Sequence, residues 1–351
     1  ANEFARRRRD AYQVYRESMP MVPRNRVLRG NGELRIYRSL DFGDLAQVCM
    51  LDTRQYRSDQ PAGDNFGSTD TDPPLSQPEQ ALLEEVFAEE LFDRDGILDP
   101  GTTLLGLKQE AWLARQLKQS RARWNVLAQQ TMVTQWNLVT TGRLNAALGL
   151  GGTLPPPLDG VLAKLETLWN VDAWDGYPAA RRRLFDLIDA TDPSNPVFVT
   201  GDIHSSWGAN LLEDFDNPDS RILAGEFVGT SVASTFLSPD PRPVHEIVRR
   251  GVDADNPHIP YFNGLFRGYM HCELDADAWT TTFRSVVSSY DEADLLSPDP
   301  AAPFTLGLVP LPGIPVRTDA VLKLASGFRN SNDRIQVESR ETLPDFLPFL
   351  P

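Results

Sequence analysis

The sequence is poor in cysteine, in positive charge and in long apolar runs. Its 351 residues include two cysteines, Cys49 and Cys272, which we interpret as buried free thiols in strand-like runs; a disulfide between them is the alternative. Lys and Arg number 34 against 49 Asp and Glu, and the formal net charge of -15 disfavours general nucleic-acid binding. No run approaches the roughly 18 apolar residues that cross a bilayer, so we expect no membrane span.

We also expect no export signal within these residues. Residues 6–9 are four arginines in a row, as in a twin-arginine signal, but residues 10–17 contain no apolar segment. We therefore interpret the arginines as the basic first turn of an ordinary amphipathic helix over residues 3–19.

Apolar periodicity predicts an α/β fold. Helical spacing over residues 107–123 runs directly into a strand at residues 124–130, and a helix at residues 177–190 precedes a strand at residues 197–200. We also expect strands at residues 33–38, 45–51 and 226–231, a hairpin at residues 267–274 and 279–286, and a short helix at residues 318–323. Loop insertions are expected near residues 58–100 and 142–170, and an extended C-terminal segment near residues 297–351.

The stretch Gly201-Asp202-Ile203-His204 stands directly after the predicted strand at residues 197–200. Asp and His two residues apart can both turn toward one bound ion where a chain leaves a sheet. The carboxyl edge of an open α/β sheet is also where ligands bind. The alternative is a plain turn, with Asp202 capping a following helix and His204 merely exposed.

The other candidate residues give weaker signals. His258 lies in a loop and is the only other histidine with a plausible site role, whereas we expect His245 on a helix surface and His271 packed inside a strand. Ser205 beside His204 suggests a serine nucleophile, but neighbours in sequence rarely reach the required geometry. A catalytic two-metal centre needs roughly six or more protein ligands, and the chain offers one convincing pair.

Eight segments of the sequence match motifs of one known family when they are taken together and in order. The segments are residues 11–20, 51–59, 105–113, 124–130, 172–178, 200–206, 226–231 and 266–269. In this combination they resemble the PhoD-like alkaline phosphatases and phosphodiesterases of the calcineurin-like metallophosphoesterase superfamily. The resemblance implies an α/β (α+β sandwich) core of two mixed sheets flanked by helices. It also implies hydrolysis of phosphate esters, a site using Fe3+ with Ca2+, and export to the periplasm or the cell exterior.

Residue roles follow from the resemblance only where the motifs match. It implies that Asp202 and His204 are metal ligands and catalytic residues, and His204 could also protonate a phosphate oxygen. Arg54 or Arg57 could pair with phosphate oxygens, although structural salt bridges would explain these arginines equally well. With His258, they form the candidate substrate-binding set.

The family's earlier motifs are absent from this sequence. These motifs are a cysteine-bearing strand, a Gly-Asp-x-x-Tyr turn and a Trp-Asp-Asp-His-Glu segment, and Cys49 stands in the wrong context to replace that cysteine. We therefore expect residues 1–351 to be the C-terminal part of one metallophosphoesterase domain, whose N-terminal half supplies further metal ligands. The alternative is a non-catalytic module of the same fold, or a processed chain, that binds a partner at its open sheet edge.

Overall fold

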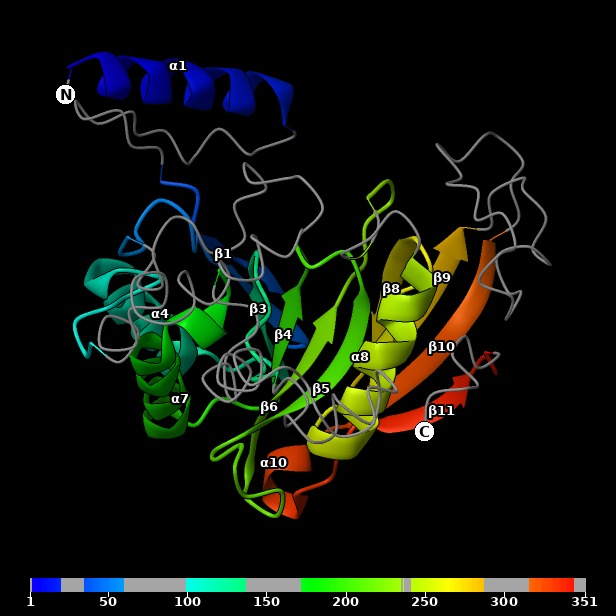
Figure 1. The fold of residues 1–351 in the computed structure, drawn as a ribbon. Helices are drawn as coiled ribbons and strands as arrows, with labels where there is room; N and C mark the ends of the chain where they lie inside the picture. The colour runs from blue at the N-terminus through cyan, green and yellow to red at the C-terminus, as the bar shows by residue number, and fades with distance from the viewer. Residues whose placement is uncertain are drawn as a thin grey trace.

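Two β-sheets and several helices make up the computed structural model of the chain (Figure 1). It describes residues 2–19, 35–59, 99–136, 172–234, 236, 241–286 and 316–343. The helical elements are α1 (Asn2–Ser18), α4 (Leu107–Gln119), the short 3-10 helix η4 (Trp174–Gly176), α7 (Pro178–Thr191), α8 (Pro241–Asp255) and α10 (Phe328–Ser331). The strands are β1 (Arg38–Phe42), β2 (Ala46–Met50), β3 (Trp124–Ala128), β4 (Pro196–Thr200), β5 (Ser206–Leu212), β6 (Ile222–Val228), β7 (Tyr261–Asn263), β8 (Gly268–Leu274), β9 (Ala278–Val286), β10 (Val316–Ala325) and β11 (Gln336–Arg340).

The larger sheet is mixed and has the order β1-β2-β3-β4-β6-β5-β7. Its strands β2, β3, β4 and β6 run parallel, whereas β1 and β5 are antiparallel to their neighbours. The smaller sheet has the order β11-β10-β9-β8 and is antiparallel throughout. The predicted α/β fold with two sheets is therefore confirmed. The expectation that both sheets are mixed is wrong, because every strand pairing of the smaller sheet is antiparallel.

Helix α7 shows how the sequence builds a helix that leads into a strand. Pro178 occupies the first turn, where the missing N–H would have no helical acceptor. Ala180, Leu184 and Ile188 recur every four residues and are at most 2% exposed, because they pack in the core beneath the larger sheet. The helix ends at Thr191. The next residue, Asp192, has a φ of 44°, in the left-handed region, and the chain then continues to β4.

Two apolar layers cover the two faces of the larger sheet. Phe198 of β4 packs into the core that α4 and α7 form on one face, and its neighbour Val197 points into the core between the sheets. Figure 1 shows α4 and α7 on one side of the larger sheet and β8 to β11 on the other. Trp279 of β9 stacks on Phe227 of β6, with ring centroids 6.1 Å apart. The larger sheet is therefore buried on both faces, which fixes the positions of its strand ends.

Some predicted elements are wrong or shifted. Residues 318–323 are not a helix but part of β10, where pairing with β9 along the whole strand overrides the local pattern. The strand predicted at residues 33–38 reaches β1 only at Arg38, and the strand predicted at residues 226–231 begins earlier, at Ile222. No helix follows Asp202, because β5 begins at Ser206.

The structure corrects the expected positions of two histidines. His245 on α8 is 1% exposed rather than on the surface, and it accepts a hydrogen bond from the backbone N–H of Gly264 at 3.1 Å. His271 does not pack in the interior, because strand alternation places it on the outer face of β8 with its side chain 54% exposed. Cys49 is buried and Cys272 is half-buried, and both are free thiols.

The predicted insertions near residues 58–100 and 142–170 lie almost wholly outside the described residues. Within the C-terminal segment near residues 297–351, the described part contains β10, α10 and β11. Among the helices that the structure describes, none has the length and apolarity to cross a membrane.

Candidate active site

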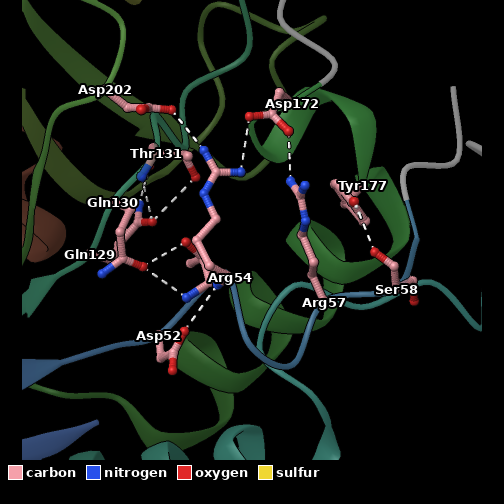
Figure 2. A network of polar contacts seen from close by, with 11 residues as sticks. Asp52, Arg54, Arg57, Ser58, Gln129, Gln130, Thr131, Asp172, Tyr177 and Asp202 are labelled. Carbon is pink, nitrogen blue, oxygen red and sulfur yellow. Dashed lines mark hydrogen bonds and ion pairs between the residues drawn. The ribbon is translucent and has the colours of Figure 1, made fainter. Parts of the chain in front are cut away.

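Three neighbouring parallel strands end at one edge of the larger sheet. Because β2, β3 and β4 run in register, the residues that follow them meet there. Figure 2 shows Arg54 after β2, Gln130 after β3 and Asp202 after β4 at this edge. The sequence predicted this meeting of strand ends, and the structure confirms it for Arg54 and Asp202.

A buried aspartate shapes the turn after β2. Asp52 is 1% exposed, and its Oδ1 accepts hydrogen bonds from the backbone N–H groups of Arg54 and Gln55, each at 3.0 Å. An aspartate that accepts from the backbone two and three residues ahead closes a tight turn. The turn directs the Arg54 side chain to the sheet edge (Figure 2).

Two glutamine side chains hold the backbone of this turn. The Oε1 atom of Gln109 on α4 accepts from the backbone N–H of Asp52 at 2.8 Å, and its Nε2 donates to the Asp52 carbonyl at 2.8 Å. Gln130 accepts from the backbone N–H of Thr53 at 2.8 Å and donates to the carbonyl of Leu51 at 3.0 Å. These bonds fix the loop to both α4 and the end of β3.

Four charged side chains form a chain of ion pairs at the edge (Figure 2). Arg54 Nη1 lies 2.9 Å from Asp172 Oδ2, and Arg54 Nη2 lies 2.9 Å from Asp202 Oδ2. Arg57 Nη1 lies 2.6 Å from Asp172 Oδ1. Burial lowers the pKa of Arg57, but the hydrogen bond and charge of Asp172 outweigh that effect and raise it overall. Asp172 is the site residue that sequence reasoning missed, although it opens a motif that carries the family resemblance.

Asp202 and His204 lie just beyond β4 in an uncommon backbone conformation. Their φ angles are 75° and 58°, in the left-handed region that Asp and His adopt more readily than most residues. Both side chains are exposed, and the preceding Gly201 donates its N–H to the Gln130 carbonyl at 3.2 Å. An aspartate oxygen and an imidazole nitrogen are thus presented at the same turn. No group of three or more His, Cys, Asp or Glu side chains able to hold a metal occurs among the described residues.

His258 does not reach this edge. Its side chain is 1% exposed, its Nε2 lies 2.7 Å from the Gln135 carbonyl, and its ring packs against Phe215 with centroids 4.8 Å apart. Burial lowers the pKa of His258 to about 4, so the ring is neutral. An interior imidazole cannot contact a substrate that arrives from solvent, and we do not retain His258 as a substrate-binding residue.

A buried carboxyl group supports the segment after β3. Glu226 of β6 is fully buried, and it accepts from the backbone N–H groups of Val133 at 2.8 Å and Thr134 at 2.7 Å and from the Thr200 hydroxyl at 3.0 Å. Burial raises the pKa of Glu226 to about 7, although these hydrogen bonds partly counteract the rise. Glu226 thereby ties this segment to the end of β4.

We expect Glu226 to make stability depend on pH between 4.5 and about 7. Because its pKa is higher in the folded chain than the ordinary 4.5, its contribution is fully present below pH 4.5 and is lost as the pH rises through about 7. Between pH 4.5 and about 7, the free energy of unfolding should fall by on the order of 3 kcal/mol. Urea unfolding of wild type and Glu226→Gln between pH 4 and about 8 measures it.

The Gln variant should lose this slope, although its missing acceptor lowers stability at every pH. Glu213→Gln, at an exposed glutamate, is the matched control and should retain the wild-type slope. Equal slopes for wild type and Glu226→Gln would contradict the prediction.

Comparison with known proteins identifies the family. A sequence model described as "PhoD-like phosphatase" matches residues 1–283. The chain belongs to the PhoD-like phosphatase family. It is 35% identical over 281 residues to alkaline phosphatase D of Bacillus subtilis (strain 168), an alignment that covers 80% of this chain and 39% of that protein. A solved structure described as "Structure of PhoD" matches with a TM-score of 0.66 and 29% identity, over 97% of this chain and 51% of that one.

The PhoD-like chain thus spans well under two thirds of the relatives that it matches. The family match includes every residue of the ion-pair chain, from Arg54 to Asp202, and the solved PhoD structure extends the likeness to most of the remaining chain. The candidate site therefore lies within the part of the chain that matches the PhoD-like family.

Proposed function

We propose that this PhoD-like chain forms part of the active site of an enzyme that hydrolyses phosphate esters (diesters, monoesters or both) with a metal-activated water. The 2.9 Å contact between Arg54 and Asp202 carries the proposal. It brings a guanidinium, which suits phosphate oxygens, next to a candidate metal-ligating carboxylate. Family membership and the match to alkaline phosphatase D support the same reaction class.

The residues fit part of a metal site. The Asp202 carboxylate is a ligand suited to Ca2+, and the His204 imidazole suits iron, so the proposed pair of Fe3+ and Ca2+ is consistent with these two donors. Such ions, when bound, lower the pKa of a water so that a hydroxide nucleophile is available near neutral pH. Two donors are too few for two ions, and we propose that the N-terminal half of the same enzyme supplies the others.

The side chains of this chain would perform three tasks. The guanidinium groups of Arg54 and Arg57 would bind phosphate oxygens and orient the ester. His204 would ligate the metal through one ring nitrogen, and the N–H of its other ring nitrogen could polarise a phosphate oxygen. Asp202 would be a metal ligand, and the turn after β4 would hold its carboxylate in position.

The net charge of -15 disfavours general nucleic-acid binding, and the family resemblance favours export.

The second candidate is a non-catalytic module that binds a protein partner. Leu40 and Phe42 of β1 favour it, because they are 38% and 57% exposed on an edge strand of the larger sheet. An exposed apolar edge strand is a surface on which another polypeptide can pair. The proposed N-terminal half of the enzyme is also a polypeptide that could pair with the edge of β1. Both candidate functions therefore predict a polypeptide bound at this edge, and only turnover distinguishes them.

Turnover and metal content test the proposal together. The isolated 351 residues should bind metal weakly and hydrolyse bis(4-nitrophenyl) phosphate and 4-nitrophenyl phosphate negligibly, because the described residues contain no group of three or more side chains able to hold a metal. A preparation that also contains the N-terminal half should retain metal by elemental analysis and turn over at least one of the two esters. No metal and no turnover in that preparation would refute the proposal and favour the binding module.

A further inference from the structure

Asp172 shares its two carboxylate oxygens between two arginines. Oδ1 lies 2.6 Å from Arg57 Nη1, and Oδ2 lies 2.9 Å from Arg54 Nη1. Figure 2 shows the carboxylate between the two guanidinium groups, with Arg54 continuing to Asp202. One acidic side chain therefore sets the position of both arginines relative to each other.

The backbone beside Asp172 is held firmly in place. Directly after it, η4 is buried, and the backbone N–H of Trp174 donates to the Met132 carbonyl at 3.4 Å. The Asp175 carboxylate accepts from the backbone N–H of Trp136 at 3.0 Å and pairs with Arg181. Asp172 itself is 42% exposed, so a carboxylate that solvent can reach stands on a buried support.

Charge explains why a carboxylate is needed at this position. Two guanidinium groups that both lie within 3 Å of one carboxylate repel each other, because like charges at short range raise the energy. A negative charge between them offsets the repulsion and fixes their orientation. Each guanidinium carries five N–H donors, so a contact to Asp172 on one side is compatible with contacts to phosphate oxygens on another.

We propose that Asp172 is a positioning residue, which holds the guanidinium groups of Arg54 and Arg57 side by side so that both bind one phosphate group at the Asp202 edge. The proposal rests on the proposed function, because it assumes that the site accepts a phosphate ester. It assigns to Asp172 no contact with the substrate. Its effect passes through the two arginines.

The test uses Asp172→Asn in the preparation that contains the N-terminal half and its metal ions. Asn keeps one acceptor oxygen but loses the charge, so the two guanidinium groups should separate. We expect KM for 4-nitrophenyl phosphate or its diester to rise about tenfold, with kcat within about threefold of wild type. Competitive inhibition by inorganic phosphate should weaken by a similar factor. Asp172→Glu, which restores the charge, should recover part of both losses.

Asp186→Asn is the matched control, because Asp186 also pairs with an exposed arginine, Arg182, but on the outer face of α7. It should leave KM and phosphate inhibition unchanged. Unchanged values for Asp172→Asn, tighter phosphate binding, or a loss in kcat alone would each overturn the proposal. Calorimetric titration with inorganic phosphate distinguishes failure of this proposal from failure of the proposed function. It measures phosphate binding by wild type and Asp172→Asn, and this comparison can be made even if the wild type has no turnover.

Discussion

Replacement of Arg181 by methionine should lower the free energy of unfolding by about 3–5 kcal/mol. Arg181 is 7% exposed and pairs with Asp175, which is 1% exposed, and it also donates to the Val133 carbonyl at 3.3 Å and the Gln135 side chain at 3.0 Å. Burial already raises the pKa of Asp175, and the Arg181 charge counteracts that rise. Without Arg181 a carboxyl group would remain buried beside the site with no compensating charge. Urea unfolding at pH 7 measures the loss.

Arg182→Met provides the comparison on the same helix. Arg182 pairs with Asp186 on the surface, with 68% and 63% of the two side chains exposed, and such pairs contribute about 0–1 kcal/mol. The double variant Asp175→Asn with Arg181→Met should recover part of the stability, because no charge is then buried. A loss for Arg181→Met as small as that for Arg182→Met would show that the buried pair contributes little.

Replacement of Asp202 by alanine should reduce turnover of the complete enzyme by about a thousandfold, since loss of a metal ligand removes several kcal/mol of transition-state stabilisation. The fold should persist, because the Asp202 side chain is 51% exposed and its contact with Arg54 lies at the surface. Hydrolysis of 4-nitrophenyl phosphate and bound metal by elemental analysis measure the effect. Both should fall together.

Asp192→Ala is a close control for this variant. Asp192 is also an exposed aspartate in the left-handed region, with φ 44°, and it also pairs with an arginine, Arg329. It lies at the end of α7 and should leave turnover within about twofold, while it imposes the same backbone cost of alanine at positive φ. Near-normal turnover and full metal content for Asp202→Ala would remove Asp202 from the site.

The sequence predicted the elements whose pattern is local. The helix that leads into β3, the helix that leads into β4 and the hairpin of β8 and β9 all have one buried face or a clear turn, and all three are observed. Strand β5 was missed, because all seven of its residues are buried and no alternation of apolar and polar residues marks it. Gly208 within it interrupts the apolar run, yet it is where Leu322 of the smaller sheet approaches closely.

The candidate site was likewise predictable from the sequence only in part. Strand order brings Arg54 and Asp202 together, and strand order follows from recognisable helix–strand units. The pairing of Arg57 with Asp172 joins positions 115 residues apart, and no local rule connects them. His258 was assigned to the site because loops often carry function, but the structure buries it against Phe215.

The glutamines that hold the turn after β2 have a consequence for how the site responds to its medium. Gln109 and Gln130 are uncharged at every pH, so dissolved salt does not screen their bonds to the backbone. The ion pairs of Arg54 and Arg57 are partly exposed and weaken as ionic strength rises. Concentrated salt should therefore release the two guanidinium groups while the backbone that carries them keeps its shape.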